Sequence, residues 1–536
     1  MGDTSVASLL AGDSLAKVPT ATEAGRVVVE FYEKRGLRAA WFRGGRLAPE
    51  ARPFLEILDG NRPAGAVGAE QAALLAELEE LGERELPDEE WMRLELGVSS
   101  ALFELGARRA HGVVLPSEVE VEWHLPLRRV DLAAHLESAL TAGKAEGFLP
   151  GLDPEDPRFA RLEREAARYR AYAALGAWPR LELPEGKISV KAGESAGAAW
   201  LVALAERLYG EGFLDAVPAL PAAVDPIPYE GELVEAVKRY QALRALPPDG
   251  NVGKATLTAL NITALERVRQ MEATLLRWRW VEPEPPGRSV LVNIPSFRVE
   301  VREGGTTTYA ARVVVGKKTW PTPIFDDRIT ALILNPPWNV PDSIAADELV
   351  AKIQKDPEYL TKENLEVLAK DEDDDGFDPQ TIDWTGLDPE RLPFRLRQRP
   401  GRGNLLGKIK FSLPNEFNVY LHDTPGKSAF ERSDRALSHG CVRVDKPFAL
   451  ANELVRGWPD WEGGKLEADA ESGTTRVISL RDPIPVRIVY FTAAVTDDGK
   501  LELYRDIYGI DRAVLAVADR KLAASIMAGS SEAAAR

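Results

Sequence analysis

The chain has 536 residues, of which 45% are apolar and 28% are charged, a balance typical of globular proteins. Its 84 acidic and 67 basic residues give a formal net charge of −17. This charge argues against a nucleic acid as the partner, because binding phosphates requires a concentrated basic face. No apolar run reaches the roughly 18 residues of a transmembrane helix, and the length suits about three or four domains.

The N-terminal segment, residues 1–20, has neither the basic start nor the apolar stretch of a signal peptide, and we expect a disordered lead-in. Residues 21–185 follow with a mostly helical pattern. Apolar side chains recur there at helical spacing, and we expect helices from Val27 onward, over 70–81, over 91–109 and up to Tyr172. The sequence therefore predicts a helical N-terminal domain.

Three of the five histidines, His111, His124 and His135, lie in this helical region at spacings unlike those of metal ligands. We interpret them as structural or solvated side chains. No H-E-x-x-H run occurs in the sequence, which therefore argues against a metal hydrolase and predicts no metal site.

Residues 186–263 form a second, smaller unit in which three helices are expected. Two of them cover 196–209 and 232–246, and a Pro-rich connector separates them. The next loop carries the pattern D-G-x-x-G-x-x-T at 249–256 and opens a helix that runs through Leu260. This arrangement is similar to the small peptidoglycan-binding module of many cell-wall enzymes, although a generic helical hairpin has the same outline.

A connecting helix, expected at roughly 264–280, and a Pro-rich linker at 282–287 occupy residues 264–287. Beyond the linker the apolar pattern alternates, which predicts strands over 289–294, 297–301, 309–315 and 329–334. Gly304 and Gly305 are expected to form a hairpin turn. We therefore expect a β-rich domain over residues 288–515.

An insertion over residues 342–405 interrupts these strands. It begins with helix-forming sequence at 345–354 and passes an acidic loop at 371–378. This loop starts like a calcium-binding loop but lacks the final glutamate, so a solvated acidic loop is the preferred interpretation and its role stays open. Five arginines follow, expected either to meet carboxylates of a ligand or to charge a strand edge: Arg391, Arg395, Arg397, Arg399 and Arg402.

The only cysteine of the chain, Cys441, ends a Ser-His-Gly-Cys turn that follows His422 across a polar loop. A strand over 417–421 is expected to deliver the histidine. A thiol and a nearby imidazole can act as a thiolate nucleophile and its base. Gly440 lets backbone N–H groups approach an oxyanion. Free cysteine has a pKa of about 8.5, so it needs a proton acceptor or positive charge nearby. A buried structural cysteine is the alternative.

After this stretch we expect a helix capped by Asp445 and ending near Arg456, and further strands over 476–508. Residues 516–536 are Ala-rich and are expected to form a C-terminal tail, helical at best and frayed at its end. A single cysteine also suits an oxidising compartment, because no second thiol in the chain can trap it.

These residues carry a family resemblance. His422 with the sequence SHGCVR at 438–443 resembles the signature of the L,D-transpeptidases of bacterial cell walls, which have a YkuD-type catalytic domain. The blocks NPPWNVP at 335–341 and LHDTP at 421–425 are similar to the large multidomain branch of this family, named for the YcbB protein.

The resemblance implies a multidomain α+β fold. It comprises a helical scaffold, the small peptidoglycan-binding domain and a β-rich, sandwich-like catalytic domain with Cys441 on one edge. The insertion at 342–405 is then expected to be a lid that caps the substrate site, because lids exclude water and complete a site.

The resemblance also implies residue roles. Cys441 is the expected nucleophile and His422 the expected base, whose charged form would lower the pKa of the thiol. The backbone N–H groups of Gly440 and Cys441 are candidate oxyanion donors. His439 is expected to shape the turn by hydrogen bonding, with direct proton transfer as the alternative. The expected substrate-binding residues are Ser438, Arg443, Tyr420, Trp338 and Asn339, of which Tyr420 and Trp338 are alternatively core residues.

The implied reaction cross-links peptidoglycan stem peptides through a thioester at Cys441, with diaminopimelate as the acceptor and without a cofactor. Two alternatives stay open: a carboxypeptidase or endopeptidase that uses water as the acceptor, and a non-catalytic wall-binding protein. Nothing in the sequence separates the transferase from the hydrolase, since the choice of acceptor depends on water exclusion.

The expected partners are stem peptides and glycan strands, and a partnership with other cell-wall synthases is left open. A periplasmic location is implied, so an export signal or membrane anchor is expected to have been removed. A role in cell shape and acylation by carbapenems follow from the same resemblance.

Overall fold

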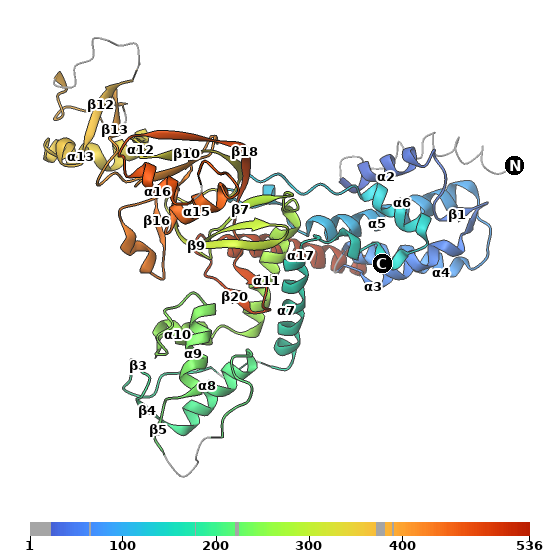
Figure 1. The fold of residues 1–536 in the computed structure, drawn as a ribbon. Coiled ribbons are helices and arrows are strands. Elements are labelled where there is room, and N and C mark those ends of the chain that lie inside the picture. Colours follow the sequence, from blue (N-terminus) through green and yellow to red (C-terminus); the bar gives the residue numbers. More distant parts are fainter. Residues whose placement is uncertain are drawn as a thin grey trace.

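The computed structural model shows three arms around a central β-rich body (Figure 1). It describes residues 23–63, 66–176, 178, 180–219, 225–370, 381–388, 391–461 and 463–535. The predicted lead-in at 1–20 lies outside these ranges. Within them, each arm has its own hydrophobic core, and the body has another. The predicted multidomain α+β fold class is confirmed.

The first arm is helical and is drawn in blue and cyan in Figure 1. It contains α2 (Glu23–Lys34), α3 (Arg52–Gly60), α4 (Ala66–Leu81), α5 (Asp88–His111) and α6 (Leu132–Ala142), and α7 (Pro157–Ala174) leads out of it. The sequence patterns did not predict α3 and α6. Buried Glu95 ties α5 to α2 and to the segment that follows α2, because its carboxylate accepts hydrogen bonds from the Tyr32 hydroxyl and the Trp41 backbone N–H.

The second arm is the small helical unit drawn in green at the bottom of Figure 1. It contains α8 (Ala198–Gly210), α9 (Glu232–Leu243) and α10 (Lys254–Leu260) around one core. In the D-G-x-x-G-x-x-T loop, Asp249 and Thr256 both contact the side-chain amide of Gln241, at 2.9 and 3.0 Å. The motif thus fixes the loop against α9 from inside.

Helix α11 (Ala264–Trp280) joins the arms to the body and has the bounds predicted for the connecting helix. The capping box between Thr263 and Glu266 explains why it starts there. The predicted C-terminal tail lies within α17 (Ile510–Ala535), a continuous helix that also contacts α11 and α4, a packing that the sequence did not predict. Its start is fixed by an ion pair between Asp511 and buried Arg277.

The body is one sheet of nine described strands. They are β7 (Arg288–Asn293), β8 (Arg298–Glu303), β9 (Thr306–Gly316), β10 (Asp326–Leu334), β14 (Ile409–Ser412), β15 (Leu421–His422), β16 (Ala436–Ser438), β17 (Val442–Val444) and β18 (Arg476–Val489). Their order is β16-β9-β17-β15-β14-β10-β18-β7-β8. Because β8 also pairs with β9, the sheet closes on itself into a barrel, and only β16 lies outside the ring.

Four expectations for the body need correction. The assembly is a closed barrel rather than an open sandwich, and Cys441 lies between edge strand β16 and interior strand β17 instead of on a free edge. The strand before His422 is shorter than expected, since β15 covers two residues. Asp445 does not cap α15 (Pro447–Leu454), because its side chain pairs with Arg312 at 2.9 Å and Lys446 is the N-cap residue. Helix α16 (Lys465–Ala470) and the hairpin β19 (Ala493–Val495) and β20 (Leu501–Leu503) complete the body.

The third arm is the insertion, drawn in yellow in Figure 1. It contains α12 (Asp342–Ile344), a π-helical turn η6 (Ala345–Leu349), α13 (Val350–Lys355), α14 (Tyr359–Lys362), β12 (Leu365–Ala369) and β13 (Phe394–Gln398). Strand β11 (Trp338–Asn339) pairs with β13 and joins this sheet to the end of β10. The helix predicted at 345–354 therefore begins with a π-helical turn, a feature that is frequent at functional sites.

Two predictions on the insertion have different outcomes. The acidic loop at 371–378, with its calcium alternative, lies outside the described residues. Of the five arginines, Arg397 and Arg399 pair with Glu366 on β12, and these contacts hold the insertion's own sheet together. This geometry favours the charged strand edge over a ligand contact.

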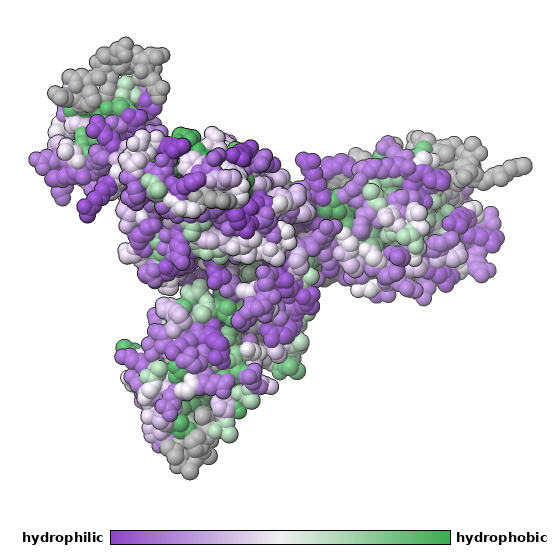
Figure 2. Space-filling view, in the orientation of Figure 1, coloured by the Kyte–Doolittle hydropathy of each residue, from purple (hydrophilic) through white to green (hydrophobic). Residues whose placement is uncertain are grey.

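The visible faces of the arms are largely hydrophilic, with apolar residues in small groups (Figure 2). Across the described ranges, no helix combines the length and the apolar character needed to span a bilayer.

Candidate active site

A cleft of about 650 Å³ lies where the insertion meets the barrel. The insertion supplies its apolar walls, including Ile344, Leu349 and Tyr359. The barrel supplies the turn at 438–441, and the β9–β10 loop supplies a third wall. The sequence-predicted residues that line it are Trp338, Tyr420, His422, Ser438, His439, Gly440, Cys441 and Arg443.

The turn that presents Cys441 is held rigidly from both sides. The Ser438 hydroxyl donates to the Cys441 carbonyl at 2.6 Å, and Ser438 itself is almost fully buried. The Thr322 hydroxyl donates to the Gly440 carbonyl at 2.7 Å. Gly440 has φ +108°, a conformation that side chains rarely adopt, so the turn requires glycine here. The thiol is therefore presented by a preorganised backbone.

The same hydrogen bonds change the expected oxyanion donors. The Gly440 N–H already donates to the Ser438 hydroxyl at 3.2 Å. It is therefore not free to stabilise an oxyanion, and the N–H of Cys441 is left as the backbone candidate from this turn. Ser438 acts on the turn rather than facing a substrate, since its hydroxyl lies between these two backbone groups.

His422 is almost fully buried on β15, and its Nδ1 faces the backbone carbonyl of Asp423. A carbonyl only accepts, so Nδ1 carries the proton and Nε2 is left as a proton acceptor. Burial and the positive charges of Arg443 and Lys410 lower the pKa of His422 to about 3. The imidazole is neutral at physiological pH.

Cys441 is partly exposed to the cleft, and its thiol donates to the Asn418 carbonyl at 3.6 Å. Burial raises the pKa of the thiol, against the lowering effects of hydrogen bonds from Tyr420 and of the charges on Lys410 and Arg443. The resting pair is therefore a neutral thiol and a neutral imidazole. This differs from the expectation that a charged His422 would activate the thiol.

His439 faces the insertion rather than its own turn. Its Nε2 lies 2.7 Å from the Glu348 carboxylate, on the π-helical turn η6, and 3.3 Å from the Lys317 ammonium. Trp320 stacks edge-on against its ring at 5.2 Å. The turn is shaped by Ser438 instead, so the geometry argues against the turn-shaping role predicted for His439 and makes this residue a contact between the barrel and the insertion.

Tyr420 and Trp338 form the wall of the cleft beside the thiol. Burial raises the pKa of Tyr420 well above its ordinary value, and the Cys441 thiol raises it further. The phenol therefore stays protonated and able to donate a hydrogen bond. Asn339 is exposed and does not line the cleft, because neighbouring residues of β11 face opposite sides and Trp338 takes the inner one. We remove it from the expected substrate contacts.

The sequence analysis missed Lys410 and Glu348. Lys410 lies on β14 directly opposite His422, and its ammonium lies 3.9 Å from the centre of the Tyr420 ring. Neither residue belongs to a recognisable motif. Only the strand pairing and the fold of the insertion bring them to the site.

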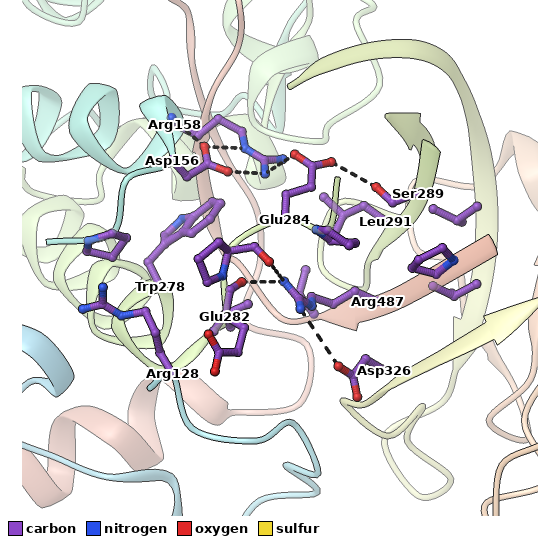
Figure 3. A pocket seen from close by; sticks show the side chains of 18 of the residues that line it. Arg128, Asp156, Arg158, Trp278, Glu282, Glu284, Ser289, Leu291, Asp326 and Arg487 are labelled. Atoms are coloured by element: carbon purple, nitrogen blue, oxygen red, sulfur yellow. Dashed lines mark hydrogen bonds and ion pairs between the residues drawn. The ribbon is translucent and has the colours of Figure 1, made fainter. Parts of the chain in front are cut away.

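A second cavity, of about 360 Å³, lies between the first arm, the linker and the barrel (Figure 3). Several of its polar groups already have protein partners: Arg158 pairs with Asp156, Glu284 accepts from the Ser289 hydroxyl, and Arg487 donates to the backbone carbonyl of Glu282. It contains neither a thiol nor a histidine. We interpret it as a packed junction between domains rather than a reaction site.

No group of three His, Cys, Asp or Glu side chains in the described parts of the chain is arranged to hold a metal ion. The three histidines of the first arm have protein contacts instead. His111 and His135 face the carbonyls of Arg128 and Phe148, and His124 contacts Glu122.

Three parts of the chain match family models of known proteins. Residues 287–478 match a family model described as the L,D-transpeptidase catalytic domain. Residues 26–165 match a model described as a scaffold domain, and residues 202–260 match one described as "Putative peptidoglycan binding domain". The three matches fall on the barrel, the first arm and the second arm.

A curated protein of Haemophilus influenzae, named "Putative L,D-transpeptidase", is 36% identical over 227 residues, or 42% of this chain. The aligned stretch is 45% of that protein, so the chain spans less than half the length of this relative. Two solved L,D-transpeptidase structures are also similar. The one from Xylanimonas cellulosilytica is 15% identical with a TM-score of 0.19, covering 57% of this chain and 100% of its own. The one from Stackebrandtia nassauensis is 13% identical with a TM-score of 0.21, covering 58% and 96%. At such TM-scores neither structure bears on the argument.

Proposed function

Since the chain contains an L,D-transpeptidase catalytic domain of the YkuD type, a scaffold domain and a peptidoglycan-binding domain, we propose that it is a cysteine-dependent transpeptidase that cross-links peptidoglycan stem peptides. The observation that carries this proposal is the placement of Cys441. The only thiol of the chain lies in the cleft, on a turn that Ser438 and Thr322 hold in place.

In the first step, the Cys441 thiol passes its proton to Nε2 of His422, and Sγ attacks the carbonyl that follows diaminopimelate in a donor tetrapeptide. The C–N bond to the terminal D-alanine breaks, and the imidazolium returns its proton to the leaving amine. The Asp423 carbonyl fixes the tautomer that this step needs. The thiol must turn from Asn418 toward His422, as catalytic hydrogen bonds often form only with substrate bound.

In the second step, the side-chain amine of a diaminopimelate on another stem attacks the thioester carbonyl. His422 accepts a proton from this amine and returns it to the thiolate as the C–S bond breaks, so the resting enzyme is regenerated. The oxyanions of both steps face the Cys441 N–H, and the protonated Tyr420 hydroxyl is a second donor at the cleft wall.

The insertion is proposed to act as a lid over this chemistry. Its side chains Ile344, Leu349 and Tyr359 line the cleft and make one wall apolar. Such a wall excludes water and therefore favours an amine over water as the acceptor. The apolar wall is the observation that favours a transferase over a hydrolase of the same peptides.

The partners and location follow from the same proposal. The substrates are stem peptides on glycan strands, held by the second arm, and the site of action is the periplasm. Other cell-wall synthases are proposed as neighbours in that compartment. A role in maintaining cell shape and single acylation of Cys441 by a carbapenem belong to this proposal.

The test is to incubate the purified protein with tetrapeptide stems and analyse the products by mass spectrometry. We expect cross-linked dimers and free D-alanine. Shortened stems without dimers would support the hydrolase instead, and no change in the stems would support a non-catalytic wall-binding protein.

A further inference from the structure

Three basic side chains form a row across neighbouring strands of the barrel, beside the nucleophile. Lys410 on β14 is the direct antiparallel partner of His422 on β15. His422 is in turn the direct parallel partner of Arg443 on β17. Directly paired residues of adjacent strands point to the same face of a sheet. The imidazole of His422 is therefore flanked by a cation on each side.

Neither flanking cation has a partner of opposite charge among the described residues. None of the ion pairs among the described residues includes Lys410 or Arg443, although both side chains are half-buried. The neighbouring Lys408 and Lys427 are each paired with a carboxylate, Glu471 and Asp423. The Lys410 ammonium lies 3.9 Å from the centre of the Tyr420 ring, and within the described residues Nε of Arg443 is buried without a hydrogen bond.

Keeping cations half-buried and unpaired costs free energy, so the arrangement needs an explanation. An anion that forms only during the reaction supplies one. The cleft beside this row contains the Cys441 thiol, which becomes an anion when His422 takes its proton.

We propose that Lys410 is a positioning residue of the acyl-transfer reaction, whose charge, together with that of Arg443, stabilises the Cys441 thiolate. The reaction in this assignment is that of the proposed function, whereas the placement of Lys410 beside His422 comes from the strand register alone. The proton moves from Sγ to Nε2 of His422, and Lys410 stays protonated throughout. Tyr420, which lies between Lys410 and the cleft, orients the ammonium by its ring.

The electrostatic picture agrees with this geometry. Burial lowers the pKa of Lys410, and the charge on Cys441 acts in the opposite direction. Burial, together with the same two cations, lowers the pKa of His422, and burial raises the pKa of Cys441, so the resting pair is neutral although the site is prepared for a thiolate. The other ionisable side chains that line the cleft are Glu122, Glu348, Lys352, Glu363 and His439.

The test uses the rate at which iodoacetamide alkylates the protein as a function of pH. Cys441 is the only thiol, so the rate reports its ionisation without assuming any enzymatic activity. Lys410→Met removes the charge and keeps the length, and Lys410→Arg keeps the charge. Lys408→Met is the matched control, because this lysine lies two residues before Lys410, its side chain is exposed and it pairs with Glu471.

We expect Lys410→Met to raise the apparent pKa of Cys441 by about one unit and to slow alkylation at pH 7 roughly tenfold. Lys410→Arg should stay within about twofold of the native rate, and Lys408→Met should be unchanged. An unchanged pKa in Lys410→Met overturns the proposal. Equal losses in the Met and Arg variants also overturn it, because they would show that charge is not what Lys410 supplies.

A measurement on the unmodified protein covers the case in which Lys410→Met does not fold. Anionic iodoacetate should react faster, relative to neutral iodoacetamide, than it does with free cysteine, because two cations face the thiol. A ratio equal to or below that of free cysteine overturns the proposal. Neither measurement depends on stem peptides, so failure of the transpeptidase proposal would be seen separately, in the product analysis.

Discussion

The contact between the insertion and the catalytic turn offers the most specific test of the lid. Glu348, on the π-helical turn η6, accepts a hydrogen bond from His439 at 2.7 Å. The two side chains remain 37% and 22% exposed, so solvent screens the interaction. We therefore assign it about 1 kcal/mol, the upper range for solvent-screened ion pairs, which corresponds to about a fivefold change in the closed population.

The perturbation is Glu348→Gln, which keeps the shape of the side chain and removes its charge. We expect turnover of stem peptides to fall about fivefold, because a closed lid is needed for transfer, while alkylation of Cys441 by iodoacetamide changes less than twofold. Glu358→Gln is the matched control, because Glu358 lies in the same insertion, is 80% exposed and pairs with the surface residue Lys362.

The loss should depend on His439. In a His439→Gln background, Glu348→Gln should have little further effect on turnover, which a double-mutant cycle measures directly. Additive losses would refute the idea that these two residues act through one contact. Equal losses of turnover and alkylation would refute the lid, since they would show damage to the barrel itself.

Two further predictions concern folding and stability. Deleting residues 342–405 and joining the ends with a short Gly/Ser loop should leave a folded barrel, because the insertion has its own core. Alkylation of Cys441 should persist while turnover of stem peptides is lost. Loss of both activities would show that the segment is structural. Burial alone would raise the pKa of Glu211, but Arg244 and Arg207 lower this pKa to about 2. The charged carboxylate therefore stabilises the fold above pH 4.5. This contribution, roughly 3 kcal/mol, is lost as the pH falls from 4.5 to 2. In thermal unfolding, Glu211→Gln should be less stable than the native protein at pH 7, and its stability should fall by less below pH 4.5. Parallel curves of stability against pH for the two proteins would contradict this assignment.

Local patterns were sufficient where a short sequence fixes its own structure. The capping box at Thr263 sets the start of α11, and the Ser-His-Gly-Cys turn brings its own hydrogen-bonding serine and its required glycine. Such features are visible in the sequence because their partners lie within three residues.

Features set by distant partners were beyond the sequence. Lys410 reaches the site only through the pairing of β14 with β15, and Glu348 only through the fold of the insertion. Asn339 was misplaced because the sequence does not say which side of a two-residue strand faces the cleft. The C-terminal helix α17 was taken for a tail because its partners, α11 and α4, are far away in the chain.

The central claim is that Cys441 forms the acyl-enzyme, and one comparison tests it directly. Native protein and Cys441→Ala, each shown to be folded by circular dichroism, are mixed with tetrapeptide stems and analysed by intact-protein and product mass spectrometry. The native protein should gain the mass of one acyl group and release cross-linked dimers, and the variant should do neither. Cross-linked dimers from Cys441→Ala would contradict the account.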